Sequence, residues 1–311
     1  MRLRRLVLFF RVAVPADPVQ PSSSIRVFDA IRALAFVGDL SMGQPIDHSV
    51  RTGWLASRLA AAIGRDAATQ SHVVCVALLR WSGCTANAPE FSDLLGDDEG
   101  GRRTMLATAS ARAAADFASS VSPLAEIHCE VSGDIARTLG MPAAVELPLR
   151  HIFETFDGTG KPEGLDASRI PAEVFLVTIA GDLEIFSRVH GLDNALRYIA
   201  ERADARYPAF LVDAVREHAV DWLHVLEQGA AAEPQPPSAA LRDATAPLEL
   251  IADVIDLKLP WMTGYSRKVA EAALHCARGM GLGNEQQQRI YRAGLIHGIG
   301  RASVANAVWD S

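Results

Sequence analysis

The fold of this chain is decided by the run Asp157-Gly158-Thr159-Gly160-Lys161-Pro162-Glu163-Gly164-Leu165, which Arg169-Ile170-Pro171 follows. Asp-Gly-Thr-Gly is ordinary turn chemistry, because glycine adopts positive φ angles at little steric cost. Helical segments are expected on both sides of the run, before Phe156 and after Val174. We therefore expect a tight loop between helices, in which Lys161 is either solvated or placed to meet a phosphate.

The composition favours an all-α fold with an aliphatic core. Hydrophobic residues make up 49% of the 311 residues but aromatic residues only 6%, so the core depends on Ala, Leu, Val and Ile. Stretches rich in Ala, Leu, Arg and Glu favour helix, and no run alternates with the period of a strand. The four cysteines form no Cys-x-x-Cys pair, so no zinc or redox motif is indicated, and we expect them to be reduced and buried.

Charge and hydropathy limit the partners of the chain. A net charge of −7 argues against a nucleic-acid-binding surface. No stretch approaches the ~20 apolar residues of a membrane span, so a cytoplasmic protein with no membrane partner is predicted. Residues 1–24 are interpreted as a disordered leader or a wrongly assigned start. A cleaved signal peptide is the alternative, although Arg11 ends the apolar run early.

Apolar spacing divides the chain into two helical blocks. In the first block, residues 25–228, helices are expected over residues 25–40, 47–63, 71–81, 104–120, 124–139, 174–189, 192–203 and 209–228, with a polar loop at 84–101. Residues 229–247 are rich in Pro and Ala and are predicted to be a linker. A second helical block covers residues 248–311.

The second block repeats the first at a constant offset. His48 and Tyr265 lie 217 residues apart, as do Arg80 and His297. Few residues are identical, so the ungapped spacing is the evidence for an internal repeat. Residues 248–311 hold about three helices, and we expect their apolar faces to be covered by the first block or by a second chain.

These motifs resemble those of the HD-GYP family of HD-domain phosphohydrolases. The loop at 157–162 differs by one residue from the family's D-G-T-G-Y-P signature, and residues 294–301 resemble its L-L-H-D-I-G-K pattern. Residues 264–270 and 304–310 resemble two further family segments. The arrangement is similar to a degenerate tandem in actinobacterial LuxR-type regulators, without their helix-turn-helix end. The resemblance implies an all-helical HD-domain bundle followed by a truncated second copy.

The resemblance also implies where metal ligands should lie. In the first block His48, His128 and Asp182 fit ligand positions, and the loop residues Asp157, Gly158, Thr159, Gly160, Lys161 and Pro162 fit a segment that contributes to substrate recognition. Other ligand positions hold residues that cannot bind metal. These decayed positions are Arg80, Trp81, Ile152 and Phe153 in the first block, and Tyr265 and Gly298 in the second.

Such a site is unsuited to two-metal hydrolysis, which needs His and carboxylate ligands around ions roughly 3.5–4 Å apart. Trp81 removes the bridging aspartate, and Arg80 brings a permanent cation toward a dication. His151 is one residue out of register, a rotation of about 100° on a helix. We expect an ion pair between Arg80 and Asp182 to fill the vacated site.

Three functions remain open at this point. The first is a non-catalytic regulatory or signalling module with no cofactor. The second is a metal-dependent phosphodiesterase that cleaves cyclic di-GMP with Fe or Mn. The third is a sensor that binds a cyclic dinucleotide without cleaving it. A homodimer is a further possible assembly, and the pair at Arg80 and Trp81 favours the first function.

Overall fold

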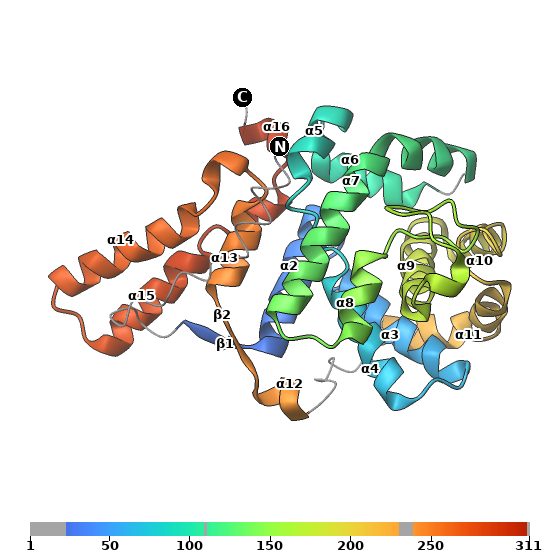
Figure 1. Ribbon diagram of the computed structural model, residues 1–311, viewed down its shortest axis with the longest axis horizontal. Helices are drawn as coiled ribbons and strands as arrows, with labels where there is room; N and C mark the ends of the chain where they lie inside the picture. Colours follow the sequence, from blue (N-terminus) through green and yellow to red (C-terminus); the bar gives the residue numbers. More distant parts are fainter. Residues whose placement is uncertain (1–22, 109–110, 230–238, 310–311) are drawn as a thin grey trace.

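The computed structural model describes residues 23–108, 111–229 and 239–309 and is almost entirely helical (Figure 1). The prediction of an all-α fold is confirmed. The first part contains β1 (Ser24–Arg26), α2 (Val27–Ser41), α3 (His48–Ala62), α4 (Ala67–Leu79), α5 (Ala88–Leu95), α6 (Asp98–Ala107), α7 (Ala111–Thr138), α8 (Ala143–Arg150), η1 (Ala167–Arg169), α9 (Ala172–His190), α10 (Leu192–Ala200) and α11 (Ala209–Glu227). The second contains α12 (Ala239–Asp243), β2 (Thr245–Pro247), α13 (Glu249–Asp256), η2 (Pro260–Met262), α14 (Tyr265–Gly279), α15 (Asn284–Ile296), η3 (Ile299–Ser303) and α16 (Asn306–Trp309).

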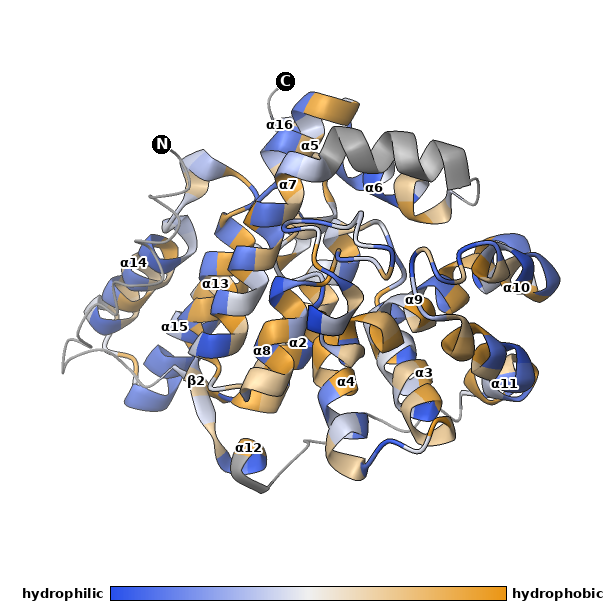
Figure 2. Cartoon of the chain, turned by 45° about the vertical axis from the view of Figure 1, so that its right-hand side comes forward, coloured by the Kyte–Doolittle hydropathy of each residue, from blue (hydrophilic) through white to orange (hydrophobic). Residues whose placement is uncertain are grey.

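The core of the first part forms around α4. The last seven residues of this helix, Val73–Leu79, are nearly all apolar, and six of them are buried because α2, α3, α8 and α9 pack around it. The helices α3 and α4 are in close contact at Gly53, where an added Cβ atom would lie 3.5 Å from that of Ala77, at ordinary contact distance. Figure 2 shows the apolar faces of these helices turned toward one another. This packing fixes the ends of α3 and α4, where the family resemblance places metal ligands.

The polar loop expected at residues 84–101 is wrong, because most of it is helical. Asp97 caps α6 by accepting hydrogen bonds from the backbone N–H groups of Glu99 and Gly100, both at 3.0 Å. Arg102 is fully buried and donates to the Cys84 carbonyl at 2.8 Å, which ties α6 to the preceding turn. The capping residue Asp97 is present in the sequence, but the glycine and acidic residues around it favoured the prediction of a loop.

The segment expected as a linker is partly regular structure. Residues 239–247 form α12 and β2, and β2 pairs antiparallel with β1. The strands are three residues long, which is too short for an alternating pattern to reveal them. The leader expected over residues 1–24 lies outside the described residues apart from Ser23 and Ser24.

The helix pairs of the two parts share the offset found in the sequence. The pair α3 and α4 begins at residues 48 and 67, and the pair α14 and α15 begins at 265 and 284, so both starts differ by 217. Their ends differ by the same number, 279 − 62 and 296 − 79. Each helix crossing also contains one glycine, although at exchanged positions: Gly53 lies on the first helix of its pair and Gly294 on the second.

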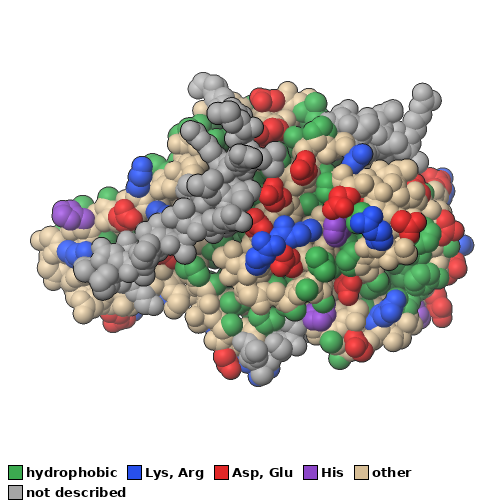
Figure 3. All heavy atoms as spheres, viewed as in Figure 1, with side chains coloured by type: hydrophobic (Ala, Val, Ile, Leu, Met, Phe, Trp, Pro, Cys, Tyr) green, Lys and Arg blue, Asp and Glu red, His purple; other side chains and the backbone are tan. Residues whose placement is uncertain are grey.

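The C-terminal part packs on the N-terminal part through α13, while α14 and α15 project from the body (Figure 1). Leu250, Ile251, Val254 and Ile255 are buried and belong to one continuous core with α2. This is the docking within one chain that the sequence predicted as one of two ways to cover the segment. On the face seen in Figure 3, basic side chains lie among acidic ones.

A buried ion pair joins the two parts. Lys258 and Asp98 are fully buried, and the Lys258 Nζ atom lies 2.5 Å from the Asp98 carboxylate. The other oxygen of Asp98 accepts the Asn306 backbone N–H at 2.7 Å. Burial lowers the pKa of Lys258, and the nearby Asp98 carboxylate opposes that lowering.

We predict that Lys258→Met lowers the free energy of unfolding by about 3–5 kcal/mol, because the buried Asp98 carboxylate loses its nearest cation and keeps only Arg102, 3.9 Å away. The double variant Lys258→Met with Asp98→Asn should be milder, because the stranded charge is also removed. Urea denaturation measures both. Glu285→Gln is the control, since its pair with Arg289 is exposed and should change stability by less than about 1 kcal/mol. Equal, small losses in all three variants would contradict the prediction.

Candidate functional site

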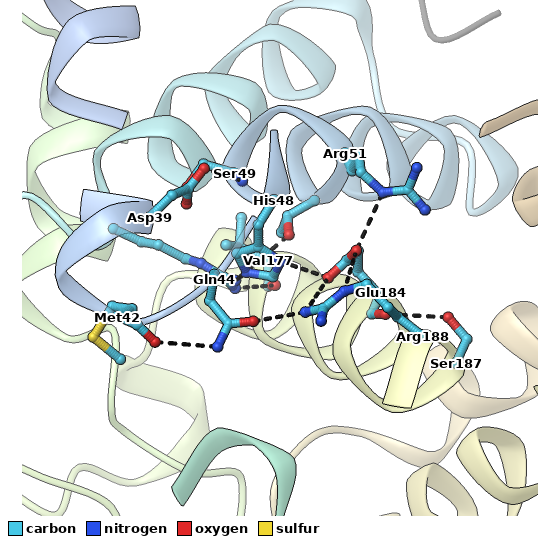
Figure 4. Close-up of polar contacts among 12 residues, drawn as sticks. Asp39, Met42, Gln44, His48, Ser49, Arg51, Val177, Glu184, Ser187 and Arg188 are labelled. Atoms are coloured by element: carbon cyan, nitrogen blue, oxygen red, sulfur yellow. Dashed lines mark hydrogen bonds and ion pairs between the residues drawn. The ribbon is translucent and has the colours of Figure 1, made fainter. Parts of the chain in front are cut away.

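The site is built around His48, the first residue of α3, which is fully buried. Its Nδ1 atom lies 2.5 Å from a carboxylate oxygen of Glu184 on α9, and its Nε2 atom faces the guanidinium of Arg80 (Figure 4). Glu184 accepts further hydrogen bonds from Arg51 at 3.1 Å and Arg188 at 3.2 Å. The neutral His48 ring therefore donates from Nδ1 to Glu184 and accepts at Nε2 from Arg80.

Arg80 caps the C-terminal end of α4, and its side chain turns inward to fill the position between α3 and α9. The residue is 4% exposed. Besides His48, it donates to the Val177 carbonyl at 3.4 Å and to the Thr52 hydroxyl at 3.5 Å. Its guanidinium carbon also lies 4.4 Å from the centre of the Trp81 ring. These contacts hold a cation where the family resemblance places a histidine ligand.

Gly181 on α9 leaves the room that this cation needs. A Cβ atom at this position would lie 2.1 Å from Nη1 of Arg80 and 2.8 Å from its guanidinium carbon. Such distances are far inside van der Waals contact, so an alanine here and the observed Arg80 conformation exclude each other. The observed conformation of Arg80 therefore depends on the glycine at position 181.

The predicted ion pair between Arg80 and Asp182 is wrong. Asp182 instead lies 2.9 Å from Nε of Arg206, in the turn that precedes α11, and its side chain is 13% exposed. Asp182 acts on Arg80 only through its nearby charge. The reason is geometric: Gly181 faces Arg80 directly, and one residue further along a helix turns the side chain by about 100°.

His128 on α7 is the second expected ligand, and it is buried against aromatic rings. Its Nε2 atom donates to the Arg80 backbone carbonyl at 2.6 Å, and its Nδ1 atom lies 3.5 Å from Sγ of Cys84. The rings of Trp81 and Phe153 lie 6.1 Å and 4.8 Å from it. Both nitrogens of His128 therefore have protein partners.

The two positions that follow α8 are filled by apolar side chains, as the sequence indicated. Ile152 is buried in the main core, and Phe153 stacks on Trp81 at 6.3 Å. His151 is the C-cap residue that follows α8, and its ring lies 4.0 Å from Glu163 of the loop. His151 therefore does not replace a lost ligand.

Burial shifts the pKa values of the site in opposite directions. It lowers the pKa of His48 to about 4 and that of His128 to about 4, so both rings are neutral at pH 7. It raises the pKa of Asp39 to about 7, against the hydrogen bonds from Ser49. Burial lowers the pKa of Arg80 to about 10, so it stays cationic. Burial acts to raise the pKa of Glu184, but the His48 hydrogen bond and nearby arginines outweigh it and lower the pKa to about 2.

The side chains do not fit a divalent metal. Within residues 23–108, 111–229 and 239–309, the structure contains no group of three His, Cys, Asp or Glu side chains able to hold one. The Nε2 lone pair of His48, which a metal would take, accepts from Arg80. A metal there would also meet the guanidinium charge, which repels it.

The loop at 157–165 is held together by its own carboxylates. Asp157 accepts from the Thr159 backbone N–H at 3.0 Å and from the Thr155 hydroxyl at 2.7 Å. The buried Glu154 carboxylate accepts the backbone N–H groups of Glu163, Gly164 and Leu165. Lys161 is exposed, so its ammonium is available to solvent or to an anion.

The C-terminal part holds an arginine in a comparable place. Arg301 is 8% exposed and donates to Asp256 at 3.3 Å and to Ser266 at 3.0 Å. Its guanidinium lies over Gly298, where a Cβ atom would overlap it, and 5.5 Å from the Tyr265 ring centre. Glycine at the position expected for an aspartate again admits the cation.

Sequence reasoning missed Glu184 and Asp39. Asp39 accepts the Ser49 backbone N–H at 3.0 Å and the Ser49 hydroxyl at 2.6 Å. Asp256 binds Ser266 in the same way, and 256 − 39 equals 266 − 49. A comparison of every acidic residue with the residue 217 positions later could therefore have identified Asp39. Glu184 gave no such signal, because His48 and Arg51 lie on another helix and only Arg188 lies one turn away on α9.

Comparison with known proteins identifies relatives for both parts. Residues 249–311 match the family model of the HD domain. The chain is 24% identical over 311 residues to 3'3'-cGAMP-specific phosphodiesterase 3 of Vibrio cholerae, covering 88% of this chain and 67% of that protein. A stretch of 52 residues is 42% identical to 3'3'-cGAMP-specific phosphodiesterase 1 of the same species, covering 17% of this chain and 12% of that protein.

The fold is also found among solved structures. A crystal structure of a cyclic GMP-AMP specific phosphodiesterase of V. cholerae matches with a TM-score of 0.71 at 21% identity, over 93% of this chain and 74% of that chain. These findings show an HD-domain match at residues 249–311 and a fold shared with that crystal structure. No helix in the described part of the chain is long and apolar enough to span a membrane.

We predict that Gly181→Ala lowers the free energy of unfolding by about 1–3 kcal/mol, because the new methyl group displaces a buried guanidinium. Thermal or urea denaturation measures the loss. Gly279→Ala is the matched control, because it lies at the end of α14 with nothing within 4 Å of the added atom. If both alanine variants are equally stable, Arg80 does not depend on Gly181.

Stability should rise with pH between about pH 4 and pH 6.5. His48 and His128 bind protons there only when unfolded, whereas Asp39 binds one only when folded. The difference, 2 − 1, is one proton more in the unfolded state, so these groups contribute a slope of about 1.4 kcal/mol per pH unit. Asp39→Asn should steepen this contribution to roughly 2.7 kcal/mol per pH unit. Urea denaturation at several pH values checks the sign of this slope. A free energy of unfolding that falls as the pH rises from 4 to 6.5 would contradict the prediction.

Proposed function

We propose that this chain is an HD-type helical module of cyclic-dinucleotide signalling whose first copy, residues 25–228, is non-catalytic. Residues 248–311 are then a partial second copy. The observation that carries this proposal is the contact between the Arg80 guanidinium and Nε2 of His48. The relatives with names referring to 3'3'-cGAMP support the connection to cyclic dinucleotides.

The arginine supports loss of catalysis in two ways. It takes the lone pair that His48 would offer to a metal, and it adds a positive charge that a buried dication would have to face. The pKa of Arg80 is about 10 despite burial, so the charge is not lost near pH 7. Arg301 supports the same interpretation for the second copy, where Gly298 stands at the aspartate position.

The repeated offset supports the interpretation as a tandem. The helix bounds, the Asp–Ser contacts at Asp39 and Asp256, and the inward-turned arginines recur in both parts. A module without chemistry in either copy is suited to regulation through binding, as a partner surface, a homodimer or a receptor for a cyclic dinucleotide. The loop with Lys161 is one place where such a ligand could meet a cation.

A second candidate function is favoured by the comparisons, namely phosphodiesterase activity on a cyclic dinucleotide. The similarity to 3'3'-cGAMP-specific phosphodiesterase 3 extends over 88% of the chain. His48, His128 and Asp182 would then be the residues that hold Fe or Mn in the first copy. That role requires Arg80 to leave its buried position and His128 to give up its bond to the Arg80 carbonyl.

Metal content and turnover test the proposal directly. We expect the purified full chain to hold well under one equivalent of Fe, Mn or Zn by elemental analysis. Hydrolysis of 3'3'-cGAMP and of cyclic di-GMP, with and without added Mn, should stay at background. The reason is that both histidines and the space between them are already occupied by protein groups.

Two results would favour the phosphodiesterase instead. One is two tightly held ions per chain. The other is Mn-supported turnover that is abolished by His128→Ala, while Cys276→Ala, an exposed and unpaired cysteine, retains it as a control. Circular dichroism must show that both variants are folded before their activities are compared.

A further inference from the structure

A cavity of about 460 Å³ opens beside Glu184, between α3 and the helices α9, α10 and α11. Its lining includes Arg51 and Arg188, the two arginines that contact Glu184 from outside the buried site. None of the proposed functions uses this cavity. It is reached from solvent, since the side chains of Arg51 and Arg188 are 23% and 33% exposed.

Arg51 brings free hydrogen-bond donors for an anion to this cavity. Two guanidinium groups, those of Arg51 and Arg188, contact the single carboxylate of Glu184. Arg51 donates to Glu184 through Nε, and its two outer nitrogens have no partner among the described residues; Figure 4 shows them turned away from Glu184. Glu227, at the end of α11, is the acidic residue in the lining, and it is exposed.

The backbone at the cavity adds donors of the same kind. Gly191, which also lines the cavity, precedes α10 and supplies no side-chain hydrogen bond to the start of that helix. The first N–H groups of a helix attract anions, because they lack partners within the helix and lie at the positive end of its dipole. Gly191 and Leu192, at the start of α10, line the same cavity as Arg51.

The remaining walls are apolar. Leu192, Val220 and Leu223 line the cavity, and Val220 is 62% exposed, which is unusual for a large aliphatic residue next to a cavity. Cavities that hold small organic ligands typically measure about 300–1,000 Å³ and combine apolar walls with a few polar groups. This cavity falls within that range, so it has room for more than a phosphate ion.

We propose that this cavity binds a phosphate monoester of mononucleotide size. The phosphate lies against Arg51 and the start of α10, and the organic part of the ligand lies against Val220 and Leu223. The Arg188 side chain, held by Gln44 at 2.6 Å as well as by Glu184, forms the fixed edge of the cavity. The site is separate from the position filled by Arg80, so binding here goes beyond the proposed module and requires no metal.

Calorimetric titration of the full chain with AMP, inorganic phosphate and adenosine tests this site. We expect saturable binding of AMP, weaker binding of phosphate, and the weakest binding of adenosine. Arg51→Gln should weaken AMP binding at least about tenfold, because a hydrogen bond to a charged group is lost. Arg58→Gln is the matched control on the same helix, since Arg58 lies over Trp54 and outside the lining, and its affinity should equal that of the unmodified chain.

A second variant avoids the contact with Glu184 altogether. His224→Glu changes an exposed lining residue to a carboxylate and should also weaken AMP binding while leaving the melting temperature unchanged. The proposal is overturned if AMP shows no saturable binding, if Arg51→Gln and Arg58→Gln bind it equally, or if adenosine binds as tightly as AMP. Metal content and hydrolysis are measured separately, so they can fail without affecting this result.

Discussion

The structure depends on one chain of hydrogen bonds, from Glu184 through His48 to Arg80. All three side chains are buried, and each forms a hydrogen bond with a neighbour that would otherwise be an unsatisfied polar group in the core. The carboxylates of Asp39, Asp182 and Glu184 all favour the Arg80 charge, and the helices α3, α4 and α9 meet around this hydrogen-bonded network. A histidine with both nitrogens engaged holds these helices together and has no lone pair left for another ligand.

The sequence predicted the parts of this arrangement that rest on local chemistry. The expected helix at 47–63 agrees with α3 within one residue, whereas the one at 71–81 begins four residues after the start of α4. The family motifs singled out Arg80, Trp81 and Phe153 only as positions without a metal ligand. The partner of Arg80 could not be predicted in this way. Whether Asp182 or His48 meets the guanidinium depends on which face α9 presents, and that is set by Gly181 and by Arg206 from a distant turn. Long-range contacts of this kind leave no periodic trace.

The helices at 88–95 and 98–107 show a different limit. Their composition is that of a loop, yet Arg102 buries its charge by donating to Ser41, Cys84 and Asn87. Those acceptors are backbone and amide oxygens at the end of α2 and in the turn before α5, so a polar side chain ties this segment to its neighbours. A buried arginine that satisfies the backbone of its neighbours has the same physical role here as Arg80 has beside α9.

The N-terminal and C-terminal parts share one polar feature beside their helix pairs. Asp39 and Asp256 both receive a serine N–H and hydroxyl, so the acceptor at this corner is kept in each copy. The cation beside it comes from different places: Arg80 ends a helix, whereas Arg301 lies in a short 3-10 turn. In each case a glycine, Gly181 or Gly298, provides the space. A polar pocket at the end of a helix pair must be filled and its charge neutralised. A guanidinium does both from any backbone position that can reach the pocket. The two parts of the chain therefore both use an arginine, although it stands at different positions.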